Sequence, residues 1–504
     1  MTNPLYEALY APLAGQGRGL MYLPGGGVLS ADDFHAMVAR AAGALVAAGL
    51  QPGDRVAVQV PKSAHALALI GGAIARGVVF LPLNTAYTAD EISYFIRDAG
   101  ARLLIADPAR ADALAPVVRA AGAGLLTLGA TGAGSFADAM AAAPTAHPVA
   151  RAADDLAGLL YTSGTTGRSK GAMLTQDNLL SNAQLLARAW RFGPDDVLLH
   201  ALPVFHTHGL FVATNTVLLS GGAMILHPGF DLDAVIAALP RATAMMGVPT
   251  FYTRLLADPR LTRDLVAHMR LFTSGSAPLL AETHAEFAAR TGHAILERYG
   301  MTETNMNTSN PYDGDRRPGT VGPPLPGVEV IVTDPETGTE LPRGKTGMIE
   351  VRGPNVFVGY WNMREKTAEE LRANGFFITG DLGRFDDDGY LHIVGRAKDL
   401  IISGGYNVYP KEVELLLDDA PGVLESAVVG VPHPDFGEAV LAVIVPADGA
   451  APDAGALETL LQGRIARYKQ PKSYEFLPAL PRNTMGKVQK ADLRARFSRR
   501  FTGE

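Results

Sequence analysis

The feature that most constrains the fold is a regular alternation of strand and helix patterns between Leu29 and about Leu128. Residues 55–60 and 78–83 have the pattern of buried strands, and residues 63–76 between them form an apolar helical segment. Strand–helix–strand units joined by short turns are typical of parallel sheets with right-handed crossovers. The sequence therefore predicts an α/β fold built on a doubly wound parallel sheet.

Helix start signals support this division of the chain. Ser30 is placed to cap a helix that reaches Ala48, and the string from Thr88 to Glu91 is a capping-box pattern before a helix that ends near Ala99. A further strand is predicted over residues 102–106. Residues 137–153 are expected to form a connector.

A glycine-rich string, Tyr161-Thr-Ser-Gly-Thr-Thr-Gly-Arg-Ser-Lys-Gly171, follows a predicted buried strand at residues 156–160. Its glycines allow backbone N–H groups to face an anion, its hydroxyls donate further hydrogen bonds, and Lys170 adds a positive charge. The spacing G-x-x-G-x-x-K differs from the G-x-x-x-x-G-K-[ST] of P-loop enzymes, which excludes that class. On composition alone, a flexible surface turn is an equal interpretation.

The string resembles the signature loop of the adenylate-forming superfamily, which includes acyl-CoA synthetases, peptide-synthetase adenylation domains and luciferases. The resemblance continues through six ordered motifs over nearly the whole chain. It implies an enzyme that uses ATP, Mg²⁺ and coenzyme A. The residues that it implies for the ATP phosphates are Thr162, Ser163, Gly164, Thr165, Thr166, Gly167 and Lys170.

Two later strings resemble the adenine and phosphate motifs of the superfamily. Residues 271–278 resemble the strand and turn under the adenine, which implies roles for Gly275, Ser276 and Ala277. The string Arg298-Tyr-Gly-Met-Thr-Glu303 implies that Tyr299 and Gly300 lie against adenine, that Thr302 contacts phosphate, and that Glu303 binds Mg²⁺ with Thr166. Without the resemblance, the first string reads as an ordinary turn and Glu303 as an exposed acid.

From residue 328 to residue 393 the pattern changes to short alternating strands, which predicts a small antiparallel barrel or sheet. The resemblance implies that Asp381 binds the ribose hydroxyls, that Arg396 reaches the ribose or phosphates, and that Lys398 is a hinge. We therefore predict a large domain over residues 1–395 and a small, mobile α+β domain over residues 396–504.

The small domain is predicted to contain a helix from Pro410, strands at residues 426–431 and 439–445, and a helix over residues 456–468 with basic residues at its end. For coenzyme A, the predicted thiol passage is Ser403, Gly404 and Gly405, and the predicted phosphate contacts are Arg464 and Lys469. A solvated helix end is an equal interpretation of these cations.

Lys487, in the string Pro481-Arg-Asn-Thr-Met-Gly-Lys487, matches the lysine that the superfamily uses to hold the substrate carboxylate against the α-phosphate. An ammonium between two anions lowers their repulsion and stabilises the charge that develops during transfer. Family analogy also permits control by a lysine acyltransferase and deacylase acting on Lys487.

Arg298 stands where the superfamily usually has a small residue beside the acyl pocket. A buried cation needs an anion, which either a protein acid such as Glu297 or the ligand supplies. A dicarboxylate satisfies this need, because one carboxylate is activated while the other pairs with the guanidinium. The string from Glu297 to Asn310 resembles malonyl-CoA synthetases, and His206, Thr207 and Ser276 are the expected neighbours of the same carboxylate.

The predicted reaction joins malonate, with methylmalonate as a variant, to coenzyme A through malonyl-AMP. The predicted catalytic residues are Lys487, Glu303, Thr302 and His206. Two alternatives remain open: a synthetase for another short or aryl carboxylate, and a luciferase-like oxygenase that shares the adenylation motifs.

The composition limits the other classes of function. A net charge of −7 argues against a nucleic-acid partner, because duplex binding usually requires a basic face. Cysteine is absent, which removes disulfides and thiolate catalysis. The N-terminal residues lack a secretion signal, and the apolar stretch of residues 198–226 is interrupted by proline, histidine and glycine, so we expect a cytoplasmic protein without a membrane span.

Overall fold

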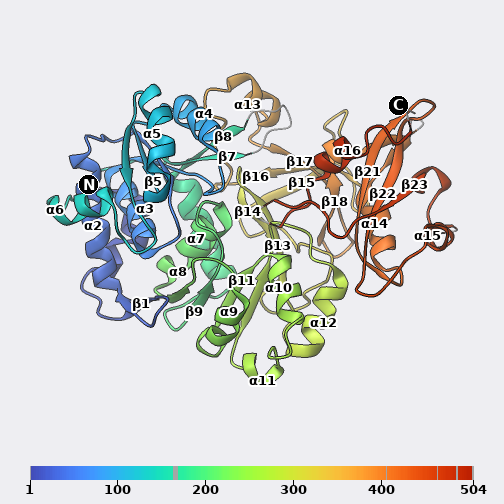
Figure 1. Cartoon of the computed structure of the whole chain (residues 1–504), viewed down its shortest axis with the longest axis horizontal. Helices are drawn as coiled ribbons and strands as arrows, with labels where there is room; N and C mark the ends of the chain where they lie inside the picture. Colours follow the sequence, from blue (N-terminus) through green and yellow to red (C-terminus); the bar gives the residue numbers. More distant parts are fainter. Residues whose placement is uncertain (1, 163–168, 404–405, 463, 484–485, 502–504) are drawn as a thin grey trace. The chain divides into compact units, whose positions relative to one another are not determined.

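The computed structural model describes residues 2–162, 169–403, 406–462, 464–483 and 486–501 (Figure 1). The chain divides into two compact units. The first comprises Met1–Val330 and Val351–Phe377, and the second comprises Ile331–Glu350 and Ile378–Glu504. These units group residues 378–395 with the C-terminal part, so a domain boundary at residue 395 stays a prediction.

The first unit contains the doubly wound sheet that the sequence predicts. Its strand order is β6-β5-β3-β4-β7-β8, and all neighbouring strands are parallel except the antiparallel pair β7 and β8. The strands are β3 (Arg55–Gln59), β4 (Val79–Pro82), β5 (Leu103–Ala106), β6 (Gly124–Thr127), β7 (Leu156–Thr162) and β8 (Lys170–Thr175).

The helices of this region begin where their capping residues predict. The Ser30 side chain accepts a hydrogen bond from the Asp33 N–H at the start of α2 (Ala31–Ala47), and Thr88 and Glu91 form a reciprocal capping box at the start of α4 (Ala89–Ala99). Helix α3 (Ala64–Arg76) lies against α2. A Cβ on Gly72 would lie 2.7 Å from the Ala42 nitrogen, so only glycine permits this close packing.

Two further helices lie in this part of the chain, α5 (Ala111–Ala120) and α6 (Ser135–Ala142). The expectation of a connector over residues 137–153 is therefore wrong at its start. Phe136 and Met140 of α6 are buried, because they lie on the face of this short helix that packs against α2.

An eight-stranded sheet follows in the order β14-β13-β12-β11-β9-β10-β1-β2, and the five strands from β13 to β10 are parallel. Parallel strands present their carboxyl ends at one edge of the sheet, where α/β proteins bind ligands. The strands are β1 (Gly19–Tyr22), β2 (Val28–Ser30), β9 (Val197–His200), β10 (Ala223–Leu226), β11 (Ala244–Gly247), β12 (Leu271–Ser274), β13 (Leu296–Met301) and β14 (Asn305–Ser309).

The core of this region is aromatic and aliphatic. Phe272, Phe287 and Tyr252 pack edge to face with ring centroids 5.0 and 5.3 Å apart. The connecting helices are α7 (Gln176–Ala189), α8 (Asn215–Ser220), α9 (Leu232–Ala238), α10 (Pro249–Leu256), α11 (Arg263–Val266) and α12 (Ala281–Thr291), and α13 (Arg364–Glu370) closes the unit. A π-helix, His208–Thr214, precedes α8.

Two sheets occupy the C-terminal part. A small sheet is present where the alternating pattern predicts one, with four strands in the order β15-β16-β17-β18, although β17 was not predicted as a strand. It lies mostly in the second unit, whereas the prediction placed it with the large domain. The second sheet runs β20-β19-β22-β21, with β23 beside β22. The strands are β15 (Glu329–Thr333), β16 (Gly347–Arg352), β17 (Phe377–Phe385), β18 (Leu391–Arg396), β19 (Ile401–Ser403), β20 (Tyr406–Val408), β21 (Val423–His433), β22 (Gly437–Pro446) and β23 (Ser473–Phe476).

The helices of the second unit are α14 (Pro410–Asp418), α15 (Ala454–Leu461) and α16 (Lys490–Arg496). Helix α14 begins at Pro410 as predicted. The helix predicted to reach residue 468 instead ends at Leu461, and a single 3₁₀ turn follows at Arg467–Lys469. In the part of the chain that the structure describes, no helix has both the length and the apolar character needed to cross a bilayer.

Candidate functional site

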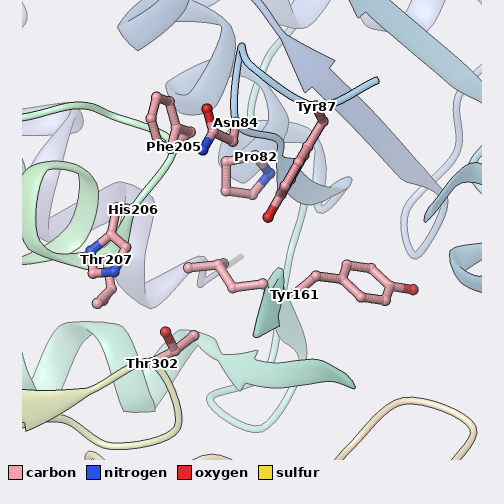
Figure 2. A pocket seen from close by; sticks show the side chains of 9 residues that line it. Pro82, Asn84, Tyr87, Tyr161, Phe205, His206, Thr207 and Thr302 are labelled. Atoms are coloured by element: carbon pink, nitrogen blue, oxygen red, sulfur yellow. The ribbon is translucent and has the colours of Figure 1, made fainter. Parts of the chain in front are cut away.

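A small pocket of about 60 Å³ lies beside the end of strand β7 (Figure 2). The residues that line it come from the end of β4 and the loop after it, from the end of β7, and from two segments that follow strands β9 and β13. They are Pro82, Asn84, Tyr87, Leu160, Tyr161, Phe205, His206, Thr207 and Thr302. His206 and Thr207, predicted for the substrate site, and Thr302, predicted to contact phosphate, are therefore brought together.

Residues that do not line the pocket form hydrogen bonds with two of its side chains. The Thr207 hydroxyl donates to the Asn305 side-chain oxygen at 2.9 Å. Figure 2 shows the Tyr161 phenol pointing away from His206 and Thr302, and its hydroxyl donates to the Asp98 carboxylate at 2.5 Å. Tyr161 therefore contributes its inner atoms to the pocket and anchors the end of β7 with its ring.

Arg298 lies on strand β13 and is only 3% exposed. Its guanidinium occupies the space beside Gly275, where a Cβ would overlap it. Within the described residues, its Nε and Nη2 atoms have no hydrogen-bond partner, although both are buried. A buried donor without a partner costs free energy, so these two N–H groups require an acceptor that the described residues do not provide.

Two polar side chains, His208 and Ser276, lie near Arg298. The His208 Nδ1 atom lies 3.2 Å from the Ser276 hydroxyl, and Ser276 adopts a left-handed backbone conformation with φ of 69°. Burial, followed by the charge of Arg298, lowers the pKa of His208 well below its ordinary value, so this imidazole is neutral. Among the described residues, the buried polar atoms without partners include His208 Nε2, Thr273 Oγ1, Ser274 Oγ and Asn305 Nδ2.

Glu297 does not supply the anion for Arg298. The two residues are neighbours on a strand and so point to opposite sides. The Glu297 carboxylate accepts from the Gly319 N–H at 3.2 Å, and burial raises its pKa to about 8. Burial lowers the pKa of Arg298 to about 9, and no carboxylate within the described ranges forms an ion pair with it. The alternative that Glu297 clamps Arg298 is therefore wrong.

A second cluster of polar side chains connects the end of β7 with α13. The Thr162 hydroxyl donates to Glu303 at 3.3 Å, and the Tyr360 hydroxyl lies 3.1 Å from the same Glu303 oxygen and 2.7 Å from Glu370. Lys170 lies 3.1 Å from both Glu370 oxygens and 4.1 Å from the centroid of the Tyr360 ring. The structure thus brings together the predicted residues Thr162, Lys170 and Glu303, and adds two that were not predicted.

Glu303 is the predicted Mg²⁺ ligand, and the described residues contain no cluster of three or more His, Cys, Asp or Glu side chains that could hold a metal on their own. Glu303 is 4% exposed, and the Thr162 hydroxyl lies at its carboxylate. Mg²⁺ in nucleotide sites typically binds one or two carboxylates together with phosphate oxygens, so this donor set fits it. Thr166, the second predicted ligand, lies outside the described residues, as do Ser163, Gly164, Thr165 and Gly167.

Helix α4 anchors both ends of the glycine-rich string. Asp98 accepts from Tyr161 at the end of β7, and the Tyr94 hydroxyl donates to the Ser169 carbonyl at 2.8 Å just before β8. Residues four apart lie on one face of a helix, which places Tyr94 and Asp98 side by side. The aromatic cluster of Tyr94, Phe95 and Tyr161 supports the same contact, with ring centroids 4.7 to 6.1 Å apart.

Sequence reasoning missed a buried network behind the pocket. The Lys62 Nζ atom lies 2.9 Å from His200 Nδ1, 2.7 Å from the His200 carbonyl and 2.8 Å from the Leu202 carbonyl. His200 Nε2 lies 3.0 Å from the Gly209 carbonyl, which only accepts, so Nε2 carries the proton and Nδ1 accepts from Lys62. The network fixes both ends of the segment that carries His206 to His208.

In the second unit, Asp381 and Arg396 face each other across β17 and β18, with a distance of 2.9 Å between Arg396 Nε and Asp381 Oδ1. Lys487 lies within the electrostatic influence of both residues and of Lys398 and Asp399. Burial, followed by the charge of Arg396, lowers the pKa of Lys487 to about 8. Four predicted residues of this unit, Asp381, Arg396, Lys398 and Lys487, therefore share one neighbourhood.

The residues predicted for coenzyme A are less concentrated. Ser403 is buried at the end of β19, and Gly404 and Gly405 lie outside the described residues. The Lys469 ammonium is already paired with Glu412 at 2.6 and 2.8 Å. Arg464 is exposed and follows the end of α15, so its proposed contact with coenzyme A stays a prediction. The nearby rings of Tyr406 and Tyr468 lie 4.8 Å apart.

Of the predicted adenine residues, Tyr299 and Gly300 lie on β13, and Gly275, Ser276 and Ala277 follow the end of β12. Strands β12 and β13 are parallel neighbours, so these residues meet at one edge of the sheet. The positions of Gly275 and Arg298 show that this glycine also makes room for the guanidinium.

Comparison with known proteins gives matches over nearly the whole chain. The chain is 57% identical to a crystal structure of ATP-bound MatB from Rhodopseudomonas palustris, with a TM-score of 0.97 and 99% of each chain covered. It is 40% identical to a feruloyl-CoA synthase of Amycolatopsis sp, with 94% of this chain and 95% of the relative covered. It is 37% identical to a sulfoacetate–CoA ligase of Cupriavidus necator (92% and 94%), and 36% identical to the mitochondrial malonate–CoA ligase ACSF3 of Mus musculus (83% and 77%).

Two family models match the chain in order. The model described as "AMP-binding enzyme" matches residues 16–361, and the model described as "AMP-binding enzyme C-terminal domain" matches residues 412–487. The first match alone covers more than half of the chain. With the two-sheet architecture of the first unit and the motifs in their expected order, these matches show that the chain belongs to the AMP-binding enzymes, the adenylate-forming superfamily that includes the acyl-CoA ligases.

Proposed function

We propose that this enzyme joins malonate to coenzyme A at the expense of ATP, through a malonyl-AMP intermediate. The observation that carries the proposal is the Arg298 guanidinium, which is buried beside Gly275 with Nε and Nη2 unpaired within the described residues. A carboxylate binds a guanidinium through two parallel N–H···O bonds and restores the hydrogen bonds that burial removed.

The charge of Arg298 discriminates between classes of acid. An acid with one carboxylate presents that group to ATP and leaves Arg298 unpaired in a buried place, which is costly. Ferulate, the acid implied by the name of one relative, has a neutral distal end. Malonate has a second carboxylate, and so it meets the need of Arg298 while its first carboxylate reacts. Sulfoacetate, implied by another relative, has a distal sulfonate and is the second candidate substrate.

In the first step, an oxygen of the free carboxylate attacks the α-phosphorus of ATP. The bond between that phosphorus and the bridging oxygen breaks, and pyrophosphate leaves. Thr162, Lys170 and Thr302 are the proposed phosphate contacts. Mg²⁺, when bound, neutralises phosphate charge, and Glu303 would hold it. Lys487 is proposed to lie between carboxylate and α-phosphate, where an ammonium stabilises the developing charge.

In the second step, the sulfur of coenzyme A attacks the acyl carbon of malonyl-AMP. The carbon–oxygen bond to AMP breaks, the thiol proton is released, and malonyl-CoA and AMP result. Ser403, Gly404 and Gly405 are the proposed thiol passage, and Arg464 and Lys469 the proposed phosphate contacts. Lys398 is the proposed hinge for the change between the two steps.

Exchange of labelled pyrophosphate into ATP tests the first step. We expect exchange with malonate, and much slower exchange with ferulate or acetate. Arg298→Met should lower kcat/KM for malonate by at least about 100-fold, because breaking a buried charge pair costs about 3–5 kcal/mol. Arg298→Lys keeps the charge but loses the two-pronged geometry, and should retain an intermediate rate.

Two results would reject the substrate assignment. One is exchange that responds to a monocarboxylate as strongly as to malonate. The other is an Arg298→Met enzyme that still discriminates in favour of malonate. Faster exchange with sulfoacetate than with malonate would select the second candidate, because both acids use the same guanidinium. Oxygen uptake without consumption of coenzyme A would instead indicate the luciferase-like alternative.

A further inference from the structure

We propose that Glu370 forms an ion pair with the Lys170 ammonium in the ligand-free enzyme and thereby lowers the affinity of the site for ATP. This inference rests on the proposed function, in which Lys170 contacts the ATP phosphates. Glu370 is a positioning residue for Lys170 and is not itself a phosphate contact.

The geometry pairs the two residues closely. Lys170 Nζ lies 3.1 Å from each Glu370 oxygen, and its ammonium rests on the face of the Tyr360 ring at 4.1 Å. The two side chains are 11% and 21% exposed, so water screens the pair only in part. The charge of Lys170 is therefore matched by a protein carboxylate before any phosphate arrives.

Tyr360 fixes the orientation of Glu370. Its hydroxyl has a single proton and lies 2.7 Å from Glu370 Oε2 and 3.1 Å from Glu303 Oε1, so it donates to only one carboxylate at a time. The shorter distance favours Glu370. Although burial raises the pKa of Glu370, the partners Tyr360, Lys366 and Lys170 together hold it below its ordinary value, so Glu370 is ionised at neutral pH.

A polyphosphate that approaches Lys170 meets two obstacles. It must compete with Glu370 for the ammonium, and its negative charge is repelled by the Glu370 carboxylate. Both effects oppose binding, and both disappear when the carboxylate becomes a neutral amide. Replacement of Glu370 by glutamine should therefore tighten the binding of ATP, whereas loss of a purely structural contact would weaken it.

The chain offers a matched control next to Glu370. Glu369 lies on the same helix, is 63% exposed, and pairs with Lys366 at 2.8 Å. Lys366 also contacts Glu370 at 3.0 Å. Glu369→Gln thus removes one negative charge and one partner of Lys366, but leaves the pair of Lys170 and Glu370 intact.

The experiment is isothermal titration of the whole enzyme with ATP, with pyrophosphate and with adenosine. For Glu370→Gln we expect the Kd for ATP and pyrophosphate to fall about tenfold, and the Kd for adenosine to stay unchanged. Glu369→Gln should leave all three values within about twofold. Glu370→Asp keeps the charge, and should not tighten the binding of ATP even if its geometry is imperfect.

Variants of Lys170 separate this inference from the proposed function. Lys170→Met should weaken the binding of ATP, and adding Glu370→Gln to it should give no tenfold recovery. Unchanged ATP binding in Lys170→Met would reject the phosphate assignment itself. Weaker ATP binding in Lys170→Met, together with unchanged or weaker binding in a Glu370→Gln enzyme of normal thermal stability, would overturn only the role of Glu370. If Glu370→Gln does not fold, tightening by Glu370→Asp would overturn it equally.

Discussion

A single residue, Arg298, is the main support for the proposed substrate of this enzyme. The sequence indicated an anion site from one arginine where the superfamily usually has a small residue. The structure adds that Gly275 makes room for the guanidinium and that His208 and Ser276 complete its surroundings. Ser276 was already predicted beside this site, but the space at Gly275 and the place of His208 were not, because contacts between side chains on different strands depend on the register of the sheet.

Arg298→Met should raise the free energy of unfolding of the ligand-free enzyme by about 1–3 kcal/mol, because it removes a buried cation whose donors lack partners. Thermal denaturation without malonate measures this change. Arg316 is the matched control. Its guanidinium donates to the carbonyls of Ala294, Pro311 and Tyr312, so Arg316→Met should lower the melting temperature. A lower melting temperature in both variants would contradict the prediction.

Glu297 gives the enzyme a stability that depends on pH. Burial raises the pKa of its carboxyl from 4.5 to about 8, so between these values the folded state retains a proton that the unfolded state loses. The free energy of unfolding should therefore fall as pH rises from 4.5 to 8, by up to about 1.4 kcal/mol per pH unit. Urea denaturation at several pH values should show a shallower slope in Glu297→Gln, and an unchanged slope would contradict the prediction.

At the scale of elements, local signals predicted the helices and strands near the N-terminus well. Ser30 and the pair of Thr88 and Glu91 cap their helices as expected. The helix predicted over residues 456–468 was too long, and its sequence contains Gly463, which costs a helix about 1 kcal/mol relative to alanine. The periodicity of the apolar residues alone gave no reason to end it at Leu461.

The junction between strands β12 and β13 should be sensitive to one methyl group. Gly275→Ala introduces a Cβ into the space of the Arg298 guanidinium and moves it from its position. We expect kcat/KM for malonate to fall by on the order of 100-fold, with a smaller rise in KM for ATP. Gly193→Ala is the control, since a Cβ there has no neighbour within 4 Å. Equal rises in KM for both substrates would show that Gly275 does not act through Arg298.

At the scale of the whole molecule, the proposed chemistry needs groups from both compact units. Arg298, Glu303 and Lys170 belong to the first, and Asp381, Arg396 and Lys487 to the second. The resemblance of the ordered motifs to those of the superfamily predicted both sets from the sequence. The predicted glycines and hydroxyls of residues 163–167 lie outside the described residues, so their phosphate contacts stay predictions.

Lys487→Ala should separate binding from chemistry. We expect malonate-dependent pyrophosphate exchange to fall at least about 100-fold, because the positive charge at the developing phosphorane is lost. The Kd for ATP should stay within about twofold, because Lys487 serves the reacting groups more than the bound nucleotide. Lys345→Ala, which removes an exposed lysine of the same unit, should change neither quantity. Normal exchange in Lys487→Ala would reject the catalytic role.

The contact of Lys62 with His200 and Leu202 has a consequence for how the enzyme binds its proposed acid substrate. Three acceptors surround the Lys62 Nζ atom, which ties the residues after β3 to the end of β9 and to Leu202. The segment of the proposed acid site that carries Thr207 is therefore ordered by folding itself, so ordering it does not oppose the binding of each substrate molecule. An enzyme built in this way should select its acid by fit to a rigid wall, with little adjustment of the loop itself.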